Sequence, residues 1–219
     1  MEDWQAHADR ARLRYADGEQ RLPGPDDPDA RQRQLTRMGN AAGAAGLAAL
    51  MLGRPDEAGD WFDRAATRYR ESWDDAPAGS WGRPIGAIKS RLLAGDVEGA
   101  AGDARWALDA GAATSESAIG RYAATLALLV LDDWPRARVV AEGLQGRDDF
   151  PAEVADALAF LAAEDVVDYT ESVEAVLRSF EQRDEYLEDM PVADTVIVLQ
   201  GLARQRGMEI ELSSPLLPD

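Results

Sequence analysis

The feature that most constrains the fold of this chain is a helical period that recurs along nearly its whole length. The first apolar face, with residues at positions i, i+4, i+7 and i+11 of one helix, consists of Trp4, Ala8, Ala11 and Tyr15. Clusters of glycine, proline and aspartate divide the rest of the chain into segments of helix length. The expected helices cover residues 3–21, 29–52, 56–73, 81–93, 97–110, 117–131, 135 onward, 150–164, 170–187 and 191–207. The sequence therefore predicts an all-α chain of about ten helices.

Several helix ends carry recognisable capping signals. Asp29 is the expected N-cap of the second helix, and Thr170 is expected to cap a helix that runs to about residue 187. Pro191 is expected to begin the last helix. That helix is expected to stop at Gly207, after a basic last turn.

Residues 208–212, Met208 to Leu212, alternate in the way that a short strand does. A lone strand leaves its backbone groups unpaired. Three alternatives follow: the segment pairs elsewhere in the chain, pairs with a second copy, or lies as an irregular extended tail. The second alternative predicts a homodimer and the third is compatible with a monomer.

The turn-plus-helix segments align on one another. Their anchoring alanines are Ala58, Ala100 and Ala137, which are 42 and 37 residues apart, and Val173 follows after another 36 residues. A period of this length with two helices in each period predicts a helical array. We expect one helical-repeat domain over residues 1–219, a right-handed stack of antiparallel helix pairs. Its parts would be a cap helix at 1–22, helix pairs at 31–187, a last helix at 191–207 and an extended tail at 208–219.

The first of these units resembles the tetratricopeptide (TPR) family in its spacing of small and aromatic residues. The positions that carry the resemblance are Gly46, Gly53, Ala58, Phe62 and Ala65, then Gly95, Asp96, Ala100 and Ala107, then Ala137. The match covers roughly residues 38–180. The repeats are longer than those of the family, and Ala42 and Ala49 replace its usual aromatic residues. The resemblance implies a TPR-like α-α superhelix.

A narrower resemblance concerns the immunity protein 49 family of bacterial polymorphic toxin systems. It is carried by Gly79-Ser80-Trp81 through Ala87-Ile88, by Ala94-Gly95-Asp96, and by the C-terminal residues 202–218. This resemblance implies a protein that binds and neutralises a toxin without catalysis.

Composition excludes several function classes. The chain has 41 acidic and 23 basic residues, a net charge of −18, and no cysteine. Lys89 is the only lysine. Disulfide scaffolds and cysteine nucleophiles are therefore excluded, and binding to nucleic acid or an anionic membrane is disfavoured. The acid excess is typical of adaptation to a salty cytoplasm, and the absence of a secretory signal predicts a cytoplasmic location.

No motif indicates catalysis, a metal or a cofactor. The glycines of residues 39–46 lie inside a helical run, so we expect close helix packing there and no phosphate loop. The four acidic clusters, 26–29, 74–75, 132–133 and 148–149, lie at expected turns, where aspartate caps helices. The sole histidine, His7, is expected on the solvated surface.

The six tryptophans suggest where a partner binds, since tryptophan is enriched in binding hot spots. We expect most to lie in the core and assign Trp81 and Trp134, which lie beside loops, to a groove. Further candidate groove residues, for which a core position is an equal alternative, are Leu47, Leu50, Met51, Tyr122 and Leu126.

The function expected from the sequence is protein binding without catalysis. In its more specific form, the chain is an immunity-type protein whose acidic face covers a basic toxin. The alternative is a small-ligand-binding protein or an enzyme that uses a carboxylate-lined pocket between helices.

Overall fold

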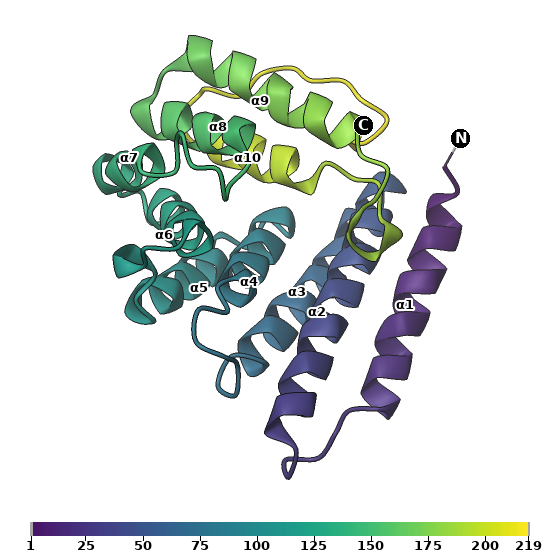
Figure 1. Ribbon diagram of the computed structural model, residues 1–219. Coiled ribbons are helices and arrows are strands. Elements are labelled where there is room, and N and C mark those ends of the chain that lie inside the picture. Colours follow the sequence, from purple (N-terminus) through teal and green to yellow (C-terminus); the bar gives the residue numbers. More distant parts are fainter. Residues whose placement is uncertain (1, 219) are drawn as a thin grey trace. The chain divides into compact units, whose positions relative to one another are not determined.

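The computed structural model describes residues 2–218 and is all-α over that range, with no strand (Figure 1). The all-α prediction is therefore confirmed. The helices are α1 (Trp4–Gln20), α2 (Pro28–Met51), α3 (Pro55–Glu71), α4 (Gly82–Leu93), α5 (Val97–Asp109), α6 (Ala118–Val130), α7 (Trp134–Glu142), α8 (Ala152–Ala163), α9 (Val166–Glu181) and α10 (Asp194–Arg204). Two 3₁₀ turns, η1 (Ala112–Thr114) and η2 (Leu187–Asp189), complete the described chain.

The chain forms two compact units. Unit 1 contains residues 1–96, 184–192 and 217–219, and unit 2 contains residues 97–183 and 193–216. The division along the chain falls inside the region 31–187, which the repeat pattern assigns to a single array of helix pairs.

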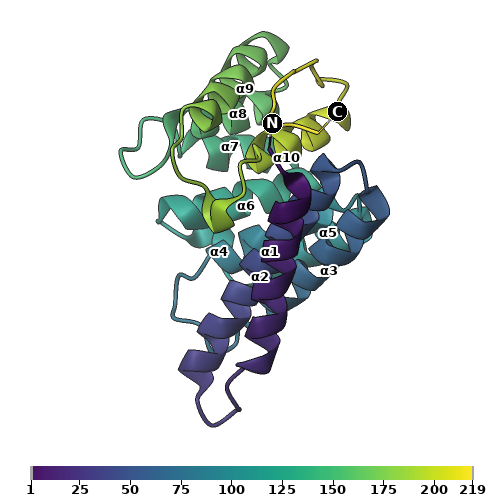
Figure 2. The same ribbon diagram turned by 90° about the vertical axis from the view of Figure 1, so that its right-hand side faces the viewer.

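Within unit 1, each helix packs against the next one in the chain, from α1 to α4. Figure 1 and, from the side of α1, Figure 2 show α1 and α2 lying side by side. Glycines make these approaches close. An ideal Cβ on Gly39 or Gly86 would lie 2.9 or 2.6 Å from the ring of Tyr69, and one on Gly46 would lie 2.7 Å from the ring of Phe62. The aromatic rings of α3 therefore pack directly on the backbones of α2 and α4, as the expected small-residue face requires.

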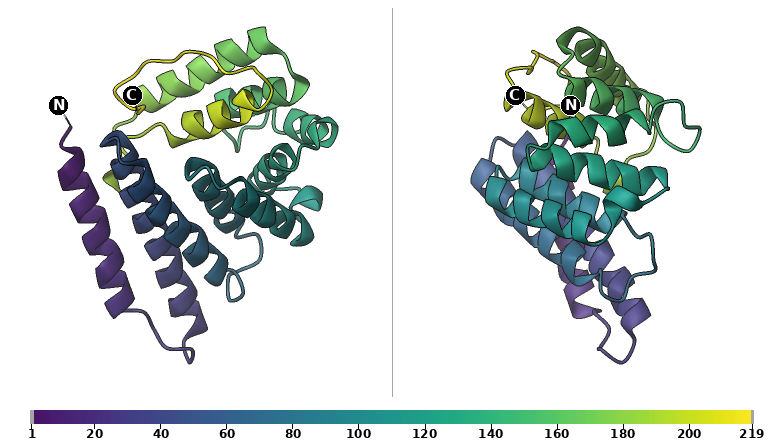
Figure 3. Two further views of the ribbon diagram at one scale, coloured as in Figure 1. Left: turned by 180° about the vertical axis from the view of Figure 1, so that it is seen from behind. Right: turned by 90° about the vertical axis from the view of Figure 1, so that its left-hand side faces the viewer.

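Within unit 2, consecutive helices from α5 to α9 pack in the same way, and α10 packs on α8 and α9. Its core is mostly aliphatic: the largest fully buried side chains are Leu126, Leu128, Leu129, Leu144, Leu158, Leu161, Tyr169, Leu199 and Leu202. The C-terminal segment, yellow in Figure 3, runs past α9 and α10. It is held there by Gln200, whose amide donates to the carbonyl of Ile210, and by Ser214, whose hydroxyl donates to Glu181 at 2.7 Å.

One backbone turn ends five of the helices. In each case a residue with positive φ is followed by an amide that donates to the carbonyl five residues earlier, which is the Schellman arrangement. The positive-φ residues are Gly53, Gly95, Asp132, Glu164 and Gly207. The glycine stop expected at Gly207 is confirmed, because the amide of Met208 donates to the carbonyl of Ala203 at 3.0 Å.

When the repeats are aligned on these turns, the anchoring residue of the fourth repeat differs from the predicted one. The residue five places after the turn is buried in the first four cases: Ala58, Ala100, Ala137 and Tyr169. The predicted fourth anchor, Val173, lies one helical turn later. The prediction was wrong because it followed small apolar side chains, whereas the backbone places a tyrosine there.

Four predicted helix termini were also wrong. Asp27, not Asp29, caps α2: its side chain accepts a hydrogen bond from the amide of Ala30 at 3.0 Å, and Pro28 takes the first helical position. Asp29 instead pairs with Arg33 along the helix.

In α9, Asp165 rather than Thr170 is the N-cap, and the helix ends at Glu181. The hydroxyl of Thr170 donates to the carbonyl of Val166 inside the helix, which is the other common use of a threonine side chain. The last helix begins at Asp194 and not at Pro191, because the chain is still extended from Met190 to Ala193.

Residues 208–212 form no strand. The segment is irregular, and it is tied to α10 by the amide of Met208 and by two side-chain contacts: the bond from Gln200 to Ile210 described above, and a bidentate pair between Arg204 and Glu209 at 2.6 and 2.9 Å. The irregular tail, one of the three alternatives, is the arrangement observed.

Candidate functional site

Four half-buried residues of α2 in unit 1 lie on one face of that helix. Asn40, Gly43, Leu47 and Leu50 are spaced at i, i+3, i+7 and i+10, and all four are half-buried. Asn40 accepts a 2.7 Å hydrogen bond from the hydroxyl of Tyr69. A Cβ at Gly43 would meet nothing within 4 Å. This face, which we call the α2 face, therefore has a polar end, an open middle and an apolar end.

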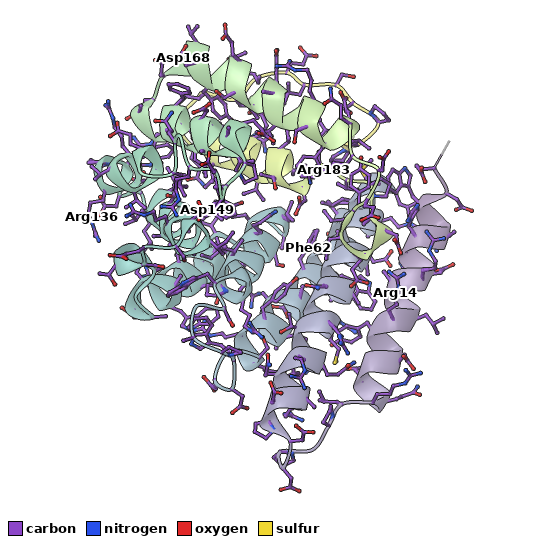
Figure 4. The ribbon with its side chains drawn as sticks, in the orientation of Figure 1. Arg14, Phe62, Arg136, Asp149, Asp168 and Arg183 are labelled. Carbon is purple, nitrogen blue, oxygen red and sulfur yellow. The ribbon has the colours of Figure 1, made fainter. Side chains whose placement is uncertain are left out.

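The apolar end of the α2 face rests on a small cluster in unit 1. Ala49, Ala58 and Phe62 are buried, and Leu47, Leu50 and Leu93 pack on them while staying partly exposed. Figure 4 labels Phe62. Of the predicted groove residues, Leu47, Leu50 and Met51 thus lie together at the end of α2, half-buried as a binding surface requires.

Two further candidate groove residues, Tyr122 and Leu126, belong to unit 2. Tyr122 is half-buried and packs against Phe150, with ring centroids 5.4 Å apart. Leu126 has no exposed surface, so it is a core residue, which was the alternative for it.

The two tryptophans assigned to the groove are both packed. Trp81 is 8% exposed and lies 5.6 Å from Trp73 between ring centroids. Trp134 is 2% exposed; its indole N–H donates to Asp132 at 2.7 Å, and the guanidinium of Arg206 lies 4.5 Å above the ring. Both rings are buried although they lie beside loops, because Trp73 packs on Trp81 and because Asp132 and Arg206 contact Trp134.

The expectation that His7 lies on the solvated surface was wrong. Its side chain is 11% exposed, with Nε2 3.0 Å from Glu2 and Nδ1 2.9 Å from Arg10. The ring also packs on Trp4, at 5.5 Å between centroids. Neighbours in the sequence thus surround the ring: Glu2 just before α1, and Trp4 and Arg10 within it.

The acidic clusters have the capping and pairing roles expected of turn aspartates. Asp27 and Asp133 cap α2 and α7, and Asp132 accepts hydrogen bonds from both Trp134 and Arg206. Hydrogen bonding to Arg147 holds the pKa of Asp149 below its ordinary value. In residues 2–218 no three carboxylate or imidazole groups converge in a way that could hold a metal ion.

Charge differs between the two units. Among residues 2–218, unit 1 has 14 basic and 20 acidic residues, whereas unit 2 has 9 basic and 20 acidic residues. Residues 148–177 contain nine carboxylates and no lysine or arginine. Around the start of α9, the exposed members of this set are Glu164, Asp165, Asp168, Glu171 and Glu174, which we call the α9 acidic face. Figure 4 labels Asp168.

The α9 acidic face also carries exposed apolar side chains. Val166 is 48% exposed and Val167 is 70% exposed. Of the five carboxylates, Glu174 is the one in an ion pair within the described chain, with Arg178 at 3.5 Å. The face thus combines uncompensated negative charge with two unburied valines.

Sequence reasoning missed one ionic cluster in unit 1. Arg14 of α1 donates to the carbonyl and the carboxylate of Glu188, both at 3.0 Å, and to Asp189 at 2.7 Å. Both acidic residues are in the left-handed region, with φ of 57° and 56°. A residue with a Cβ costs about 1–2 kcal/mol in that conformation. No local pattern links Arg14 to residues 174 and 175 positions away, so the sequence held no signal for this contact.

The chain matches no family model, and it has no significant match among curated proteins or solved structures. None of the helices within residues 2–218 is both long and apolar enough to cross a membrane.

Proposed function

We propose that the chain is a non-catalytic protein-binding module built as a TPR-like stack of helix pairs. Three facts support the stack: the recurring turn, the buried residue five places after it, and the packing of consecutive helices within each unit. Helix-pair arrays present extended surfaces that suit protein partners. The α2 face is one such surface, since it is half-buried and apolar at one end.

The more specific proposal is an immunity-type protein that neutralises a basic toxin, as the resemblance to the immunity protein 49 family implies. The observation that carries it is the α9 acidic face, with its uncompensated carboxylates around Val166 and Val167. Adaptation to a salty cytoplasm explains an acidic excess in both units, but it gives no reason for the scarcity of basic residues in unit 2. A concentrated negative surface accelerates association with a basic partner.

We further propose that the chain acts as a monomer, because residues 208–212 contact α10 and present no strand to a second copy. Light scattering over a range of protein concentrations tests this. A mass that doubles as the concentration rises would contradict it.

The test of function uses the product of any toxin-like gene that neighbours the gene for this chain. A variant with Glu164→Gln, Asp168→Asn, Glu171→Gln and Glu174→Gln removes four charges from the α9 acidic face. The matched control, Asp26→Asn, Asp60→Asn, Asp74→Asn and Asp75→Asn, removes four exposed charges from unit 1. We expect the first variant to slow association by about tenfold or more at low salt and the control to change it little.

Equal slowing in both variants would contradict a specific face. Failure to bind any such protein, together with a small metabolite that raises the melting temperature, would instead support the alternative of a ligand-binding protein or enzyme.

A further inference from the structure

Residues 184–192 belong to unit 1, although the residues on both sides of them in the chain belong to unit 2. We call this segment the strap. Its turn η2 packs against α2, and Met190 and Val192 are buried at 3% and 2% exposure. The strap therefore covers part of the α1–α2 surface of unit 1.

Arg14 supplies a polar attachment of the strap. Arg14 contacts the backbone carbonyl of Glu188 and the carboxylates of Glu188 and Asp189. The side chain of Arg14 is 43% exposed and that of Asp189 is 72% exposed, whereas that of Glu188 is 19% exposed. Ion pairs this open to water are weakened by salt.

The conformation of the strap works against this attachment. Glu188 and Asp189 are consecutive residues with positive φ, a conformation that residues with a Cβ disfavour and that persists only where surrounding contacts hold it. Leu187, the residue before them, is 70% exposed and gains little from docking. The ion pairs of Arg14, together with the buried Met190 and Val192, thus hold a strained turn in place.

We propose that the strap is a latch, released from unit 1 by local opening while both units stay folded, and that Arg14 holds it closed. The proposal goes beyond the proposed function, because it concerns the strap and not the α2 face or the α9 acidic face. The opening itself involves no partner, so it can be measured on the chain alone.

The experiment is hydrogen exchange, followed by mass spectrometry, on the full chain. The reporters are the amides of Asp189 and Met190, which donate to the carbonyls of Tyr186 at 3.0 Å and Leu187 at 3.2 Å. We compare Arg14→Gln with Arg204→Gln, which removes a more exposed arginine–carboxylate pair from unit 2. Arg14→Gln should accelerate exchange at these two amides by about tenfold or more, with the amides of α6 and α9 unchanged.

A second pair of variants separates strain from charge. Glu188→Gln keeps the left-handed residue and weakens the contact with Arg14, so the strap should open more often. Asp189→Asn suits the left-handed conformation and can still accept from Arg14, so its strap should exchange no faster than that of Glu188→Gln. Added salt should accelerate exchange in the unmodified chain.

Two results would overturn the latch. One is exchange of the strap amides at the same rate as the α6 and α9 amides in the unmodified chain, which would show that the strap opens only with global unfolding. The other is an unchanged strap in Arg14→Gln. If the strap opens as proposed but no protein partner is found, the latch stands and the proposed function fails.

Discussion

The two units use their arginines differently. In unit 1, four arginines join separate elements, besides pairs that close within a few residues: Arg12 pairs with Glu57, Arg68 with Glu19, Arg91 with Asp63 and Arg14 with Glu188. In unit 2, most ion pairs close within a few residues: Arg136 with Asp133, Arg138 with Glu142, Arg147 with Asp149, Arg178 with Glu174 and Arg204 with Glu209. Arg206, by contrast, reaches Asp132.

The cores differ in parallel. In unit 1, aromatic rings lie directly on glycine backbones, and in unit 2 leucines and alanines fill the space between helices. The same chain architecture is thus held by tight, specific contacts in one unit and by general apolar burial in the other. We expect unit 1 to be more sensitive to added volume and to salt, and unit 2 to depend more on a few large side chains.

The largest expected change in the free energy of unfolding comes from removing a tryptophan from each unit. Trp134→Ala removes a buried indole together with its contacts to Asp132 and Arg206, so it should lower the free energy of unfolding by about 3–5 kcal/mol. Trp61→Ala in unit 1 removes a half-buried ring that packs edge-on against Tyr15, and should cost about 1–2 kcal/mol. Urea denaturation followed by circular dichroism measures both. Equal losses would remove the contrast between the units.

Added volume on α2 gives the next largest effect. Gly46→Ala places a methyl group 2.7 Å from the ring of Phe62, and should destabilise by about 1–3 kcal/mol. Gly43→Ala, one helical turn away, meets open space and should stabilise by about 0.5–1 kcal/mol through helix propensity. The difference between the two midpoints in urea checks the prediction. A stabilising Gly46→Ala would show that Phe62 can move aside.

Alkaline stability should depend on Tyr169 in unit 2. Burial, with a smaller contribution from Glu209, raises the pKa of its hydroxyl above the ordinary value. A phenol with a raised pKa in the folded state stabilises the protein below its unfolded pKa of about 10 and loses that contribution as the pH rises further.

Tyr169→Phe should therefore cost about 1 kcal/mol at neutral pH, because the hydroxyl donates to Gln200 at 3.1 Å, and should be relatively more stable above about pH 10. Urea denaturation at both pH values measures this. Parallel stability curves for the two proteins would contradict it.

The smallest effect tests the ion pairs. Arg68→Gln breaks contacts with Glu19, Glu71 and Tyr15 and should cost about 1 kcal/mol at low salt, whereas Arg138→Gln breaks one pair within α7 and should cost about 0.3–0.5 kcal/mol. Added salt should reduce the destabilisation caused by Arg68→Gln by more kcal/mol than that caused by Arg138→Gln. Denaturation midpoints at two ionic strengths check it. A larger cost for Arg138→Gln would reverse the proposed contrast.

Periodicity and turn residues were enough to predict the helices, because both are local properties of the chain. Helix ends were harder to predict where two nearby residues could each serve as the N-cap, as Asp27 and Asp29 could for α2. Contacts made over long sequence separations left no local mark. The contact between Arg14 and Glu188 is one example, and the pair of Arg206 and Asp132 is another.

The recurring turn at the helix ends has a consequence for recognising chains of this kind. Its requirement is a backbone conformation at one position, and that position is filled by glycine three times, by aspartate once and by glutamate once. A repeat motif defined by residue types therefore becomes hard to recognise in the later repeats, although each of them keeps the same turn conformation. Aligning repeats on the sign of a dihedral angle brings Tyr169 into register with Ala58, Ala100 and Ala137, a correspondence that no comparison of side chains would suggest.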